Sequence, residues 1–167
     1  EVTPTYFTKR QAGLDYRIEL DDSEFGISYH YSDTNDSGSP AIAMDIDFIY
    51  GNRVNIDGKF KVEGWNVNWV IGYLDSIHGM DNFSKRPGVM PAMERYNYAT
   101  ANTTDFKLHI DNGNQQNLWK FGIDGYIADH DSTITNPSNA MFKIANFNDV
   151  KDNRIGVFAE WQGVFND

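Results

Sequence analysis

The sequence contains no cysteine among its 167 residues. This absence excludes a disulfide framework, a thiolate metal site and a cysteine nucleophile. Basic residues are also few, because 14 Lys and Arg stand against 24 Asp and Glu, which gives a formal net charge of -10. Such an acidic chain is repelled by phosphate backbones and by anionic lipid surfaces, which argues against nucleic acid as a partner.

Long apolar runs are missing as well. No stretch of the sequence approaches the roughly 20 apolar residues that a membrane-spanning helix needs. The Gly-x-Ser-x-Gly motif of serine hydrolases and the Gly-x-x-x-x-Gly-Lys motif of phosphate-binding loops are both absent. These absences favour a non-enzymatic protein. The frequent Asn, Asp, Tyr and Trp residues are typical of extracellular β proteins, so we expect a secreted or cell-surface location.

The dominant pattern is an alternation of apolar and polar residues with a period of two, which predicts β-strands. Turn signals stand between these segments, at Gly51-Asn52, Glu63-Gly64 and Asp111–Asn114. The expected strands cover residues 14–20, 25–31, 42–48, 54–62, 65–73, 106–110, 119–123, 141–144 and 155–165. We therefore predict one all-β domain over residues 1–167, an antiparallel β-barrel of about eight strands, with a β-sandwich as the alternative.

The alternation also predicts which side chains share a face. An acidic, soluble chain must hide its apolar face, so we expect that face to point into the barrel. The residues predicted to face inward are Val54, Ile56, Phe60, Trp69, Phe121, Val157 and Trp161. The same alternation fits an outer-membrane barrel, whose apolar side chains point outward, and this is kept as an alternative.

The segment 76–104 shows no sustained alternation, and we predict a long irregular insertion there. Irregular loops of this length are uncommon in compact domains and are usually functional. The insertion is interpreted either as a ligand-binding lid over the barrel mouth or as a structural plug. Its Met and aromatic residues supply adaptable apolar contact, and its cations suit an anionic group such as a haem propionate. The candidate ligand-binding residues are His78, Met80, Phe83, Lys85, Arg86, Met90, Met93, Arg95, Tyr96 and Tyr98.

Three further positions carry metal-related hypotheses. His30 stands between two tyrosines, a setting that suits haem-iron ligation. Asp129 and Asp131 stand at a strand end, where their oxygens suit weak calcium binding. No cluster offers three ligands at a workable spacing, so we predict no tightly bound transition metal.

Two segments carry a resemblance to a known family. The segment Asp45–Phe60 resembles the start of the eight-stranded barrel of transferrin-binding protein B, where a strand ends in Asp-Phe, turns, and returns through a Val-x-Gly strand. The segment Phe158–Phe165 is similar to the closing strand of that family, with its Ala-x-Glu and Gly-x-Phe. Related surface lipoproteins and secreted haemophilin-like proteins share the barrel. The resemblance implies a Gram-negative protein that captures iron, haem or a host protein.

The leading hypothesis is therefore a non-enzymatic secreted or cell-surface binding protein. Its ligand would be haem, an iron carrier or a host protein, with haem and weakly bound calcium as the candidate cofactors. Two alternatives remain open. One is a carbohydrate-binding module or a glycan-active β enzyme, which would use exposed Trp or Tyr and a carboxylate. The other is an outer-membrane β-barrel. The sequence leaves the oligomeric state open.

Overall fold

The computed structural model describes residues 7–38, 42–114 and 116–164. Its regular elements are β1 (Thr8–Leu20), β2 (Ser23–Ser37), β3 (Asp45–Val62), β4 (Trp65–Asp81), the short 3₁₀ helix η1 (Pro91–Met93), β5 (Tyr96–Asp111), β6 (Asn117–Asn136) and β7 (Asn139–Gly163). The all-β prediction is confirmed. Across the described ranges, no helix has the length and apolarity that crossing a membrane requires.

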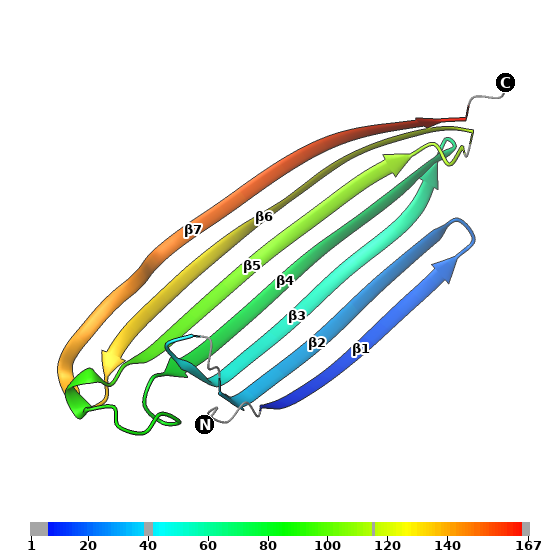
Figure 1. Cartoon of the computed structure of the whole chain (residues 1–167). Helices are drawn as coiled ribbons and strands as arrows, with labels where there is room; N and C mark the ends of the chain where they lie inside the picture. Colours follow the sequence, from blue (N-terminus) through cyan, green and yellow to red (C-terminus); the bar gives the residue numbers. More distant parts are fainter. Residues whose placement is uncertain (1–6, 39–41, 115, 165–167) are drawn as a thin grey trace.

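The strands form one antiparallel sheet in chain order, β1 to β7, with β1 and β7 at its edges (Figure 1). The described residues therefore hold seven strands in an open sheet, where about eight in a closed barrel were expected. In two places, a pair of predicted strands is one continuous strand in the structure. The predicted strands 42–48 and 54–62 merge into β3, and the predicted strands 141–144 and 155–165 merge into β7. Gly51 pairs with both Ser32 and Ser76, so the expected turn at Gly51-Asn52 is the middle of β3. The predicted final strand also included Phe165, which lies outside the described residues.

Short hairpins close one end of the sheet, here called the turn end. Asp21-Asp22 joins β1 to β2, and Glu63-Gly64 joins β3 to β4. Glu63 and Gly64 both have positive φ, 48° and 84°, as a hairpin turn of type I′ requires. The opposite end, here called the loop end, holds the connection between β2 and β3 and the longer one between β4 and β5.

The strand register aligns side chains into rows that cross the whole sheet. Neighbouring residues of a strand point to opposite faces, and paired residues of adjacent strands share a face. One row consists of Tyr16, Ile27, Ile56, Ile71, Phe106, Gly125 and Ile155. The adjacent row, on the other face, consists of Asp15, Ser28, Asn55, Gly72, Asp105, Tyr126 and Arg154. In this part of the sheet, one face is apolar and the other is polar.

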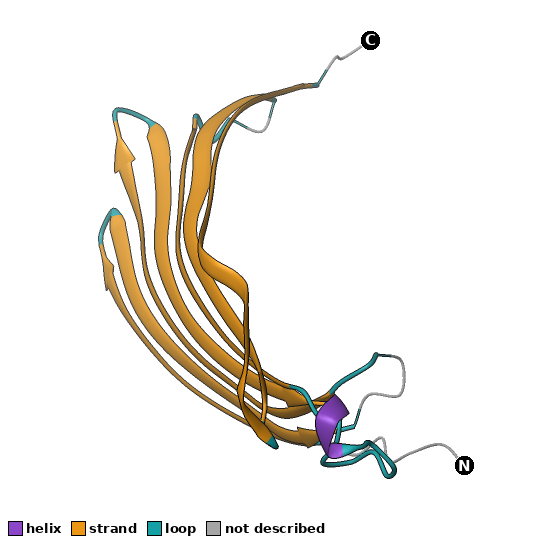
Figure 2. Cartoon of the chain, turned by 90° about the vertical axis from the view of Figure 1, so that its left-hand side faces the viewer, coloured by secondary structure: helices purple, strands orange, loops and turns teal. Residues whose placement is uncertain are grey.

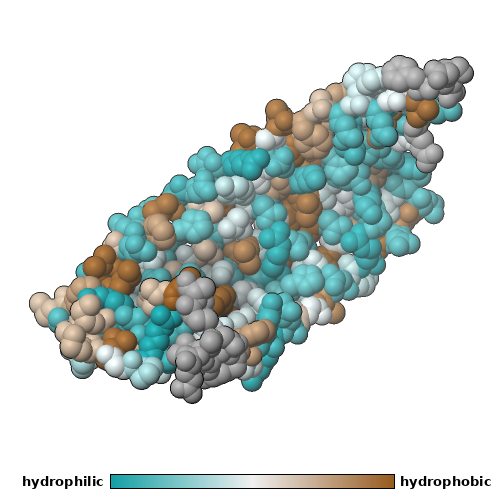
Figure 3. Space-filling view, viewed as in Figure 1, coloured by the Kyte–Doolittle hydropathy of each residue, from teal (hydrophilic) through white to brown (hydrophobic). Residues whose placement is uncertain are grey.

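The sheet is curved along its strands, so one face is concave and the other convex (Figure 2). The concave face is turned to the viewer in Figure 1. The same view in space-filling form is mostly hydrophilic over the strands (Figure 3). The polar rows therefore line the concave face, and the apolar rows lie on the convex face.

The described strands enclose no hydrophobic core. Ala99 and Ala128 are the buried apolar residues of the described part, in which no large side chain is fully buried. The chain exposes 11478 Å², whereas a compact protein of the same mass exposes about 8,400 Å². The excess follows from a single-layer sheet, which has no second layer to cover either face.

The prediction of inward-facing apolar side chains is wrong in direction. The residues named for it share one face, as the alternation required, but this face is convex and exposed. Ile56 is 47% exposed and Val157 is 82% exposed, and Phe121 and Trp161 are also among the exposed large side chains. The prediction assumed that a chain in water must bury this face. The structure provides nothing in the described residues that covers it.

The predicted insertion 76–104 is narrower in the structure. β4 continues to Asp81 and β5 begins at Tyr96, so the irregular segment is 82–95, which we call the β4–β5 loop. Near the loop end, both faces of β4 and β5 mix polar and apolar side chains. For example, Ile77 and Asp81 share a face, as do Ser76 and Met80. Alternation therefore fails there although the backbone remains paired as strands.

Candidate functional site

The convex face carries a continuous apolar surface next to the turn end, which we call the apolar band. It crosses all seven strands and has no charged side chain on the rows that define it. Its members are Leu14, Tyr16, Ile18, Leu20, Phe25, Ile27, Tyr29, Val54, Ile56, Phe60, Val62, Trp65, Val67, Trp69, Ile71, Tyr73, Phe106, Leu108, Ile110, Trp119, Phe121, Ile123, Ile127, Ile155, Val157 and Trp161. An exposed apolar surface of this extent marks an interaction site.

Tryptophan forms the border of the apolar band at the turn end. The ring centroids of Trp119 and Trp161 are 6.1 Å apart, and Phe121 links Trp119 to Trp65 at 6.1 and 6.3 Å. The indole of Trp161 donates a hydrogen bond to Asn117 Oδ1 at 2.7 Å. The Trp161 ring therefore combines apolar contact with a hydrogen bond to a polar group at the start of β6.

Tyrosine forms the opposite border, toward the loop end. The hydroxyl of Tyr29 donates to Asn52 Oδ1 at 2.7 Å, and that of Tyr73 donates to Asn102 Oδ1 at 3.3 Å. Asn52 and Asn102 belong to one convex row, in which Asp75 stands between them. Two tyrosines at this border of the band thus donate their hydroxyls to a polar row.

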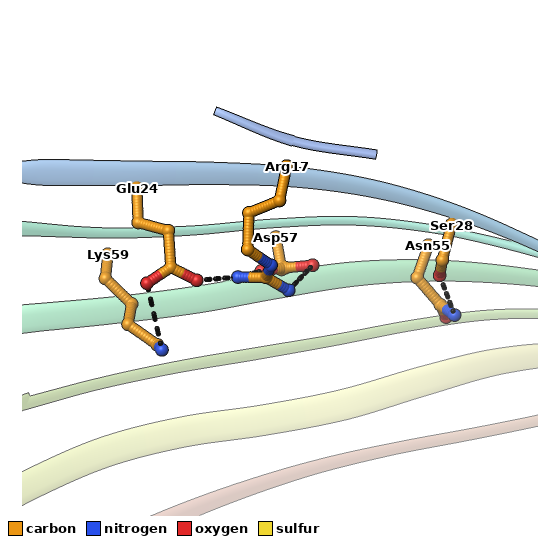
Figure 4. Close-up of polar contacts among 6 residues, drawn as sticks. All are labelled: Arg17, Glu24, Ser28, Asn55, Asp57 and Lys59. Carbon is orange, nitrogen blue, oxygen red and sulfur yellow. Dashed lines mark hydrogen bonds and ion pairs between the residues drawn. The ribbon is translucent and has the colours of Figure 1, made fainter. Parts of the chain in front are cut away.

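The concave face is held together by ion pairs between neighbouring strands (Figure 4). Arg17 of β1 bridges Glu24 of β2 and Asp57 of β3, with 3.1 Å between Arg17 Nη1 and Asp57 Oδ2. Lys59 Nζ lies 3.4 Å from the second oxygen of Glu24. Asn55 donates to the Ser28 hydroxyl at 3.1 Å on the same face. The ion pairs among these contacts place positive and negative side chains next to each other on the concave face.

A second ion pair spans two strand spacings. Arg53 Nη2 of β3 donates to both carboxylate oxygens of Asp105 of β5, at 2.8 and 3.0 Å. Gly72 of β4 stands between them, and a Cβ there would lie 2.6 Å from Arg53 Nη2. Because Gly72 has no side chain, the Arg53 guanidinium has room to cross β4 and reach Asp105.

Two hollows lie on this polar face. The larger, about 540 Å³, is at the turn end, and its charged and titratable lining consists of Glu19, Asp21, Asp22, Glu24, Lys59, Lys61, His109 and Asp111. The other, about 480 Å³, is lined by His30 and Arg53 among others. His30 Nε2 lies 3.5 Å from Asp15 Oδ1. The haem-ligand role of His30 stays a prediction.

The β4–β5 loop is fastened to the sheet by its own predicted ligand residues. Arg86 donates two hydrogen bonds to the buried Asp45 carboxylate, at 2.7 and 3.1 Å, and a third to the Ile42 carbonyl at 2.7 Å. The hydrogen bond to Asp45 raises the pKa of Arg86. Lys85 Nζ lies 3.3 Å from Asp36 Oδ1. Two of the predicted cations therefore hold the loop against the end of β2 and the start of β3.

The end of the loop is held by β6 and β7. The Arg95 guanidinium lies 4.1 Å from the centroid of the Phe142 ring and donates to the Ala92 and Glu94 carbonyls. Next to it, Tyr96 stands at the first position of β5, beyond the apolar band, and donates to Asp47 Oδ2 at 3.0 Å. Burial, together with this hydrogen bond, raises the pKa of Tyr96 to about 12.

The remaining predicted ligand residues are not brought together in one cavity. His78 and Met80 belong to β4, and the backbone N–H of Phe83 donates to the buried Asp81. Met90, Met93 and Tyr98 are exposed, with Met90 at 66% and Met93 at 54%. Whether any of these binds a ligand stays a prediction.

No group of three or more His, Asp or Glu residues able to hold a metal occurs among residues 7–38, 42–114 and 116–164. Asp131 Oδ1 accepts a hydrogen bond from the Asp149 backbone N–H at 2.8 Å. Lys151 Nζ lies 3.9 Å from Asp129 Oδ1, an ion pair too long for a hydrogen bond. Weak calcium binding at Asp129 and Asp131 stays a prediction.

Sequence reasoning missed the borders of the apolar band. A signal was present, because all four tryptophans occupy apolar positions of predicted strands, and Trp65 and Trp119 stand at the first position of theirs. In the apolar run 65–73, Trp65 stands at one end and Tyr73 at the other. This order, with Trp at one end and Tyr at the other, is the pattern that aromatic girdles give to strands in a membrane.

No family model matches the chain, and no curated protein matches it. Solved structures do resemble it. The copper transporter OprC is 16% identical with a TM-score of 0.76, and the match covers 93% of this chain and 26% of that one. The ferric yersiniabactin uptake receptor FyuA from Yersinia pestis is 10% identical with a TM-score of 0.62, covering 93% of this chain and 25% of that one. The chain thus spans about a quarter of the length of either.

These comparisons support a β-barrel-like fold. They give no specific support to the resemblance to transferrin-binding protein B, because the matched chains are about four times longer and the matched region is an open sheet.

Proposed function

We propose that this chain forms part of the wall of an outer-membrane β-barrel transporter. The convex face would contact lipid, and the concave face would line the interior. The observation that carries the proposal is the apolar band: a convex surface apolar across seven strands, bordered by tryptophan on one side and by tyrosine on the other.

The size of the band fits the hydrocarbon layer. The eight residue-to-residue steps from Trp65 to Tyr73 extend about 26 Å at roughly 3.3 Å per step. A strand tilt of about 40° reduces this to about 20 Å, close to the apolar height of about 25 Å known for outer-membrane barrels. The apolar part of each strand is therefore about as long as one crossing of the hydrocarbon layer requires.

Three connections fit the same orientation, whereas the two-residue connection between β6 and β7 also lies at the loop end. Outer-membrane barrels have short periplasmic turns and longer extracellular connections. The two-residue turns Asp21-Asp22 and Glu63-Gly64 lie directly beside the apolar band, whereas the β4–β5 loop lies beyond the polar half of the strands. The turn end would face the periplasm, and the loop end would face outside the cell.

The open edges indicate that the wall is larger than these seven strands. β1 and β7 each have a strand partner on one side, in the described sheet. Backbone N–H and C=O groups in the hydrocarbon layer must be paired, because no water reaches them there. Further strands would therefore be needed to close the wall, and the small share of OprC and FyuA that the chain matches agrees with this size.

The ligand would be a small metal-containing molecule and not a host protein. Support comes from the printed functions of the two similar structures, a copper transporter and a ferric yersiniabactin uptake receptor. The concave face adds to this support, since a wall of paired charges suits a water-filled or polar interior. The proposed location is then the cell surface, and no catalytic step is required.

The membrane half of the proposal can be tested with single cysteines, because the chain has none of its own. Ile71→Cys places a label on the convex face, and Asn68→Cys places one on the concave face of the same strand. In phospholipid vesicles with brominated acyl chains, a fluorophore at position 71 should be quenched by the lipid, and one at position 68 should not. Equal quenching at both positions would contradict the proposed orientation.

The transport half needs a separate readout. Bacteria that express the protein should accumulate more copper, or more of a ferric siderophore, than cells with an empty vector. Accumulation of neither, in cells where position 71 is quenched by lipid, would reject the transport function and leave the membrane assignment standing.

A further inference from the structure

All five methionines of the chain lie at the loop end of the sheet. None occurs in the apolar band, although Met suits an apolar surface as well as Leu or Ile does. They are Met44 just before β3, Met80 near the end of β4, Met90 and Met93 in the β4–β5 loop, and Met141 near the start of β7. Met90, Met93 and Met141 are strongly exposed, so they are not core residues.

Met90 and Met93 form a pair within one tight turn. The Met93 backbone N–H donates to the Met90 carbonyl at 2.7 Å. Met93 ends η1 and Met90 is its N-cap, so the two residues are separated by one 3₁₀ turn. Residues three apart in such a turn lie within about 7 Å at their Cα atoms. Each side chain has three rotatable bonds, which lets both sulfur atoms reach one ion.

The surrounding contacts hold this turn in place. Asn82 donates to the Met93 carbonyl at 3.1 Å and accepts from the Arg95 backbone N–H at 2.7 Å. The buried Asn136 of β6 donates to the Pro91 and Ala92 carbonyls at 3.0 and 3.2 Å. The backbone is therefore fixed while both thioether side chains remain exposed. A fixed backbone lowers the entropic cost of bringing two ligands to one ion.

From these observations, we infer that Met90 and Met93 form a binding site for a soft monovalent cation of the cuprous class. Thioethers are soft ligands that select Cu(I) over hard cations. The net charge of -10 favours the approach of any cation, and the two sulfur atoms then select the soft one. The inference deepens the proposed function and rests on it in one respect: the loop end faces outside the cell, so the pair would meet the cation before it enters the barrel.

The test is an anaerobic titration of the detergent-solubilised protein with Cu(I) in competition with a chromophoric Cu(I) chelator. Double substitution Met90→Leu with Met93→Leu removes both sulfur atoms and keeps apolar side chains of similar volume. Met141→Leu is the matched control, because Met141 is an exposed thioether outside the turn. The wild-type protein and the control should bind Cu(I) with equal affinity, and the double variant should bind at least tenfold more weakly.

Three results would overturn the inference. They are unchanged Cu(I) affinity in the double variant, an equal loss in Met141→Leu, or Zn²⁺ binding as tight as Cu(I) binding at the turn. The labelling at positions 71 and 68 separates this outcome from failure of the proposed function. Lipid quenching at position 71 without Cu(I) binding rejects the methionine site alone, and Cu(I) binding without lipid quenching rejects the membrane wall alone.

Discussion

The two halves of the sheet differ in how their convex surface is built. Next to the turn end, the row containing Ile56 and Ile71 is apolar across the strands. Four residues further toward the loop end, about 13 Å along each strand, the row on the same face contains Asn52, Asp75 and Asn102. A sheet in uniform solvent has no reason to change polarity so abruptly along one face. The edge of a bilayer would supply that reason under the proposed function.

The halves also differ in what stabilises them. The turn half presents exposed apolar side chains on one face and cross-strand ion pairs on the other, and lipid would cover the first under the proposed function. The loop half depends on particular polar contacts, among them those of Arg86 with Asp45 and of Asn136 with the β4–β5 loop. Substitutions in the two halves should therefore fail for different reasons, which the following predictions use.

The largest effect is expected in the loop half, at Arg86→Leu. This change removes the cationic partner of Asp45, whose side chain is 5% exposed. Loss of one member of a buried ion pair costs about 3–5 kcal/mol. Hydrogen exchange of the β4–β5 loop should rise accordingly, while the turn half should keep its protection. The control is Lys85→Leu, since the partner of Lys85 is a largely exposed carboxylate, and its effect should be below about 1 kcal/mol.

A charge in the apolar band should have the next largest effect. Ile71→Arg places a cation on the convex face near the middle of the band, where a lipid-facing Arg costs about 2–4 kcal/mol. Asn68→Arg places the same charge on the polar face of the same strand and should change the unfolding free energy by less than about 0.5 kcal/mol. Chemical denaturation in lipid vesicles measures both. Equal effects would remove the distinction between the two faces.

Gly72→Val should have an intermediate effect on the polar face. The new side chain would occupy the path of Arg53 to Asp105, and overpacking of this kind costs about 1–3 kcal/mol. The ion pair itself is partly exposed and is worth about 0–1 kcal/mol. The matched control is Gly156→Val on the edge strand β7, where the atom nearest to an added Cβ is Asp124 Oδ1 at 3.2 Å. A larger loss at Gly156 would show that the space above Gly72 is unimportant.

The smallest effect is expected at the border between the halves. Tyr29→Phe removes the hydrogen bond to Asn52 and keeps the ring, so it should cost about 0.5–1.5 kcal/mol. Tyr16→Phe is the control, because the Tyr16 ring lies inside the band, and it should be nearly neutral in the same denaturation measurement. A neutral result at Tyr29 would argue against a role of the tyrosine border.

The turn half was readable from the sequence because its two faces differ in polarity. Alternation located the strands there, and the hairpin at Glu63-Gly64 was predicted from its residues and is confirmed by their positive φ. Alternation alone does not reveal which environment each face contacts, because an apolar side chain alternates identically against a core and against lipid. The direction of Ile56 and Val157 was therefore predicted wrongly.

The loop half was harder to predict for a related reason. Ile77, Asp81 and Tyr98 share one face there, and no uniform environment selects a single polarity for it. Backbone pairing determines that β4 ends at Asp81 and that β5 begins at Tyr96. Such pairing produces no alternation of apolar and polar residues that the sequence would show. Arg86 and Arg95 hold the β4–β5 loop through contacts with segments far apart in the chain. The sequence does not reveal such contacts, so the residue types alone suggested a ligand site.

The most direct measurement of the central claim uses the four native tryptophans. Trp65, Trp69, Trp119 and Trp161 all lie on the convex face. In vesicles whose acyl chains carry bromine, the tryptophan fluorescence of the protein should be strongly quenched, with aqueous iodide nearly ineffective. Among single-tryptophan variants, Trp69 should be quenched by bromine nearest the bilayer centre, and the other three by bromine nearer the interface. Strong quenching by iodide, with none by brominated lipid, would contradict the assignment of the convex face to lipid.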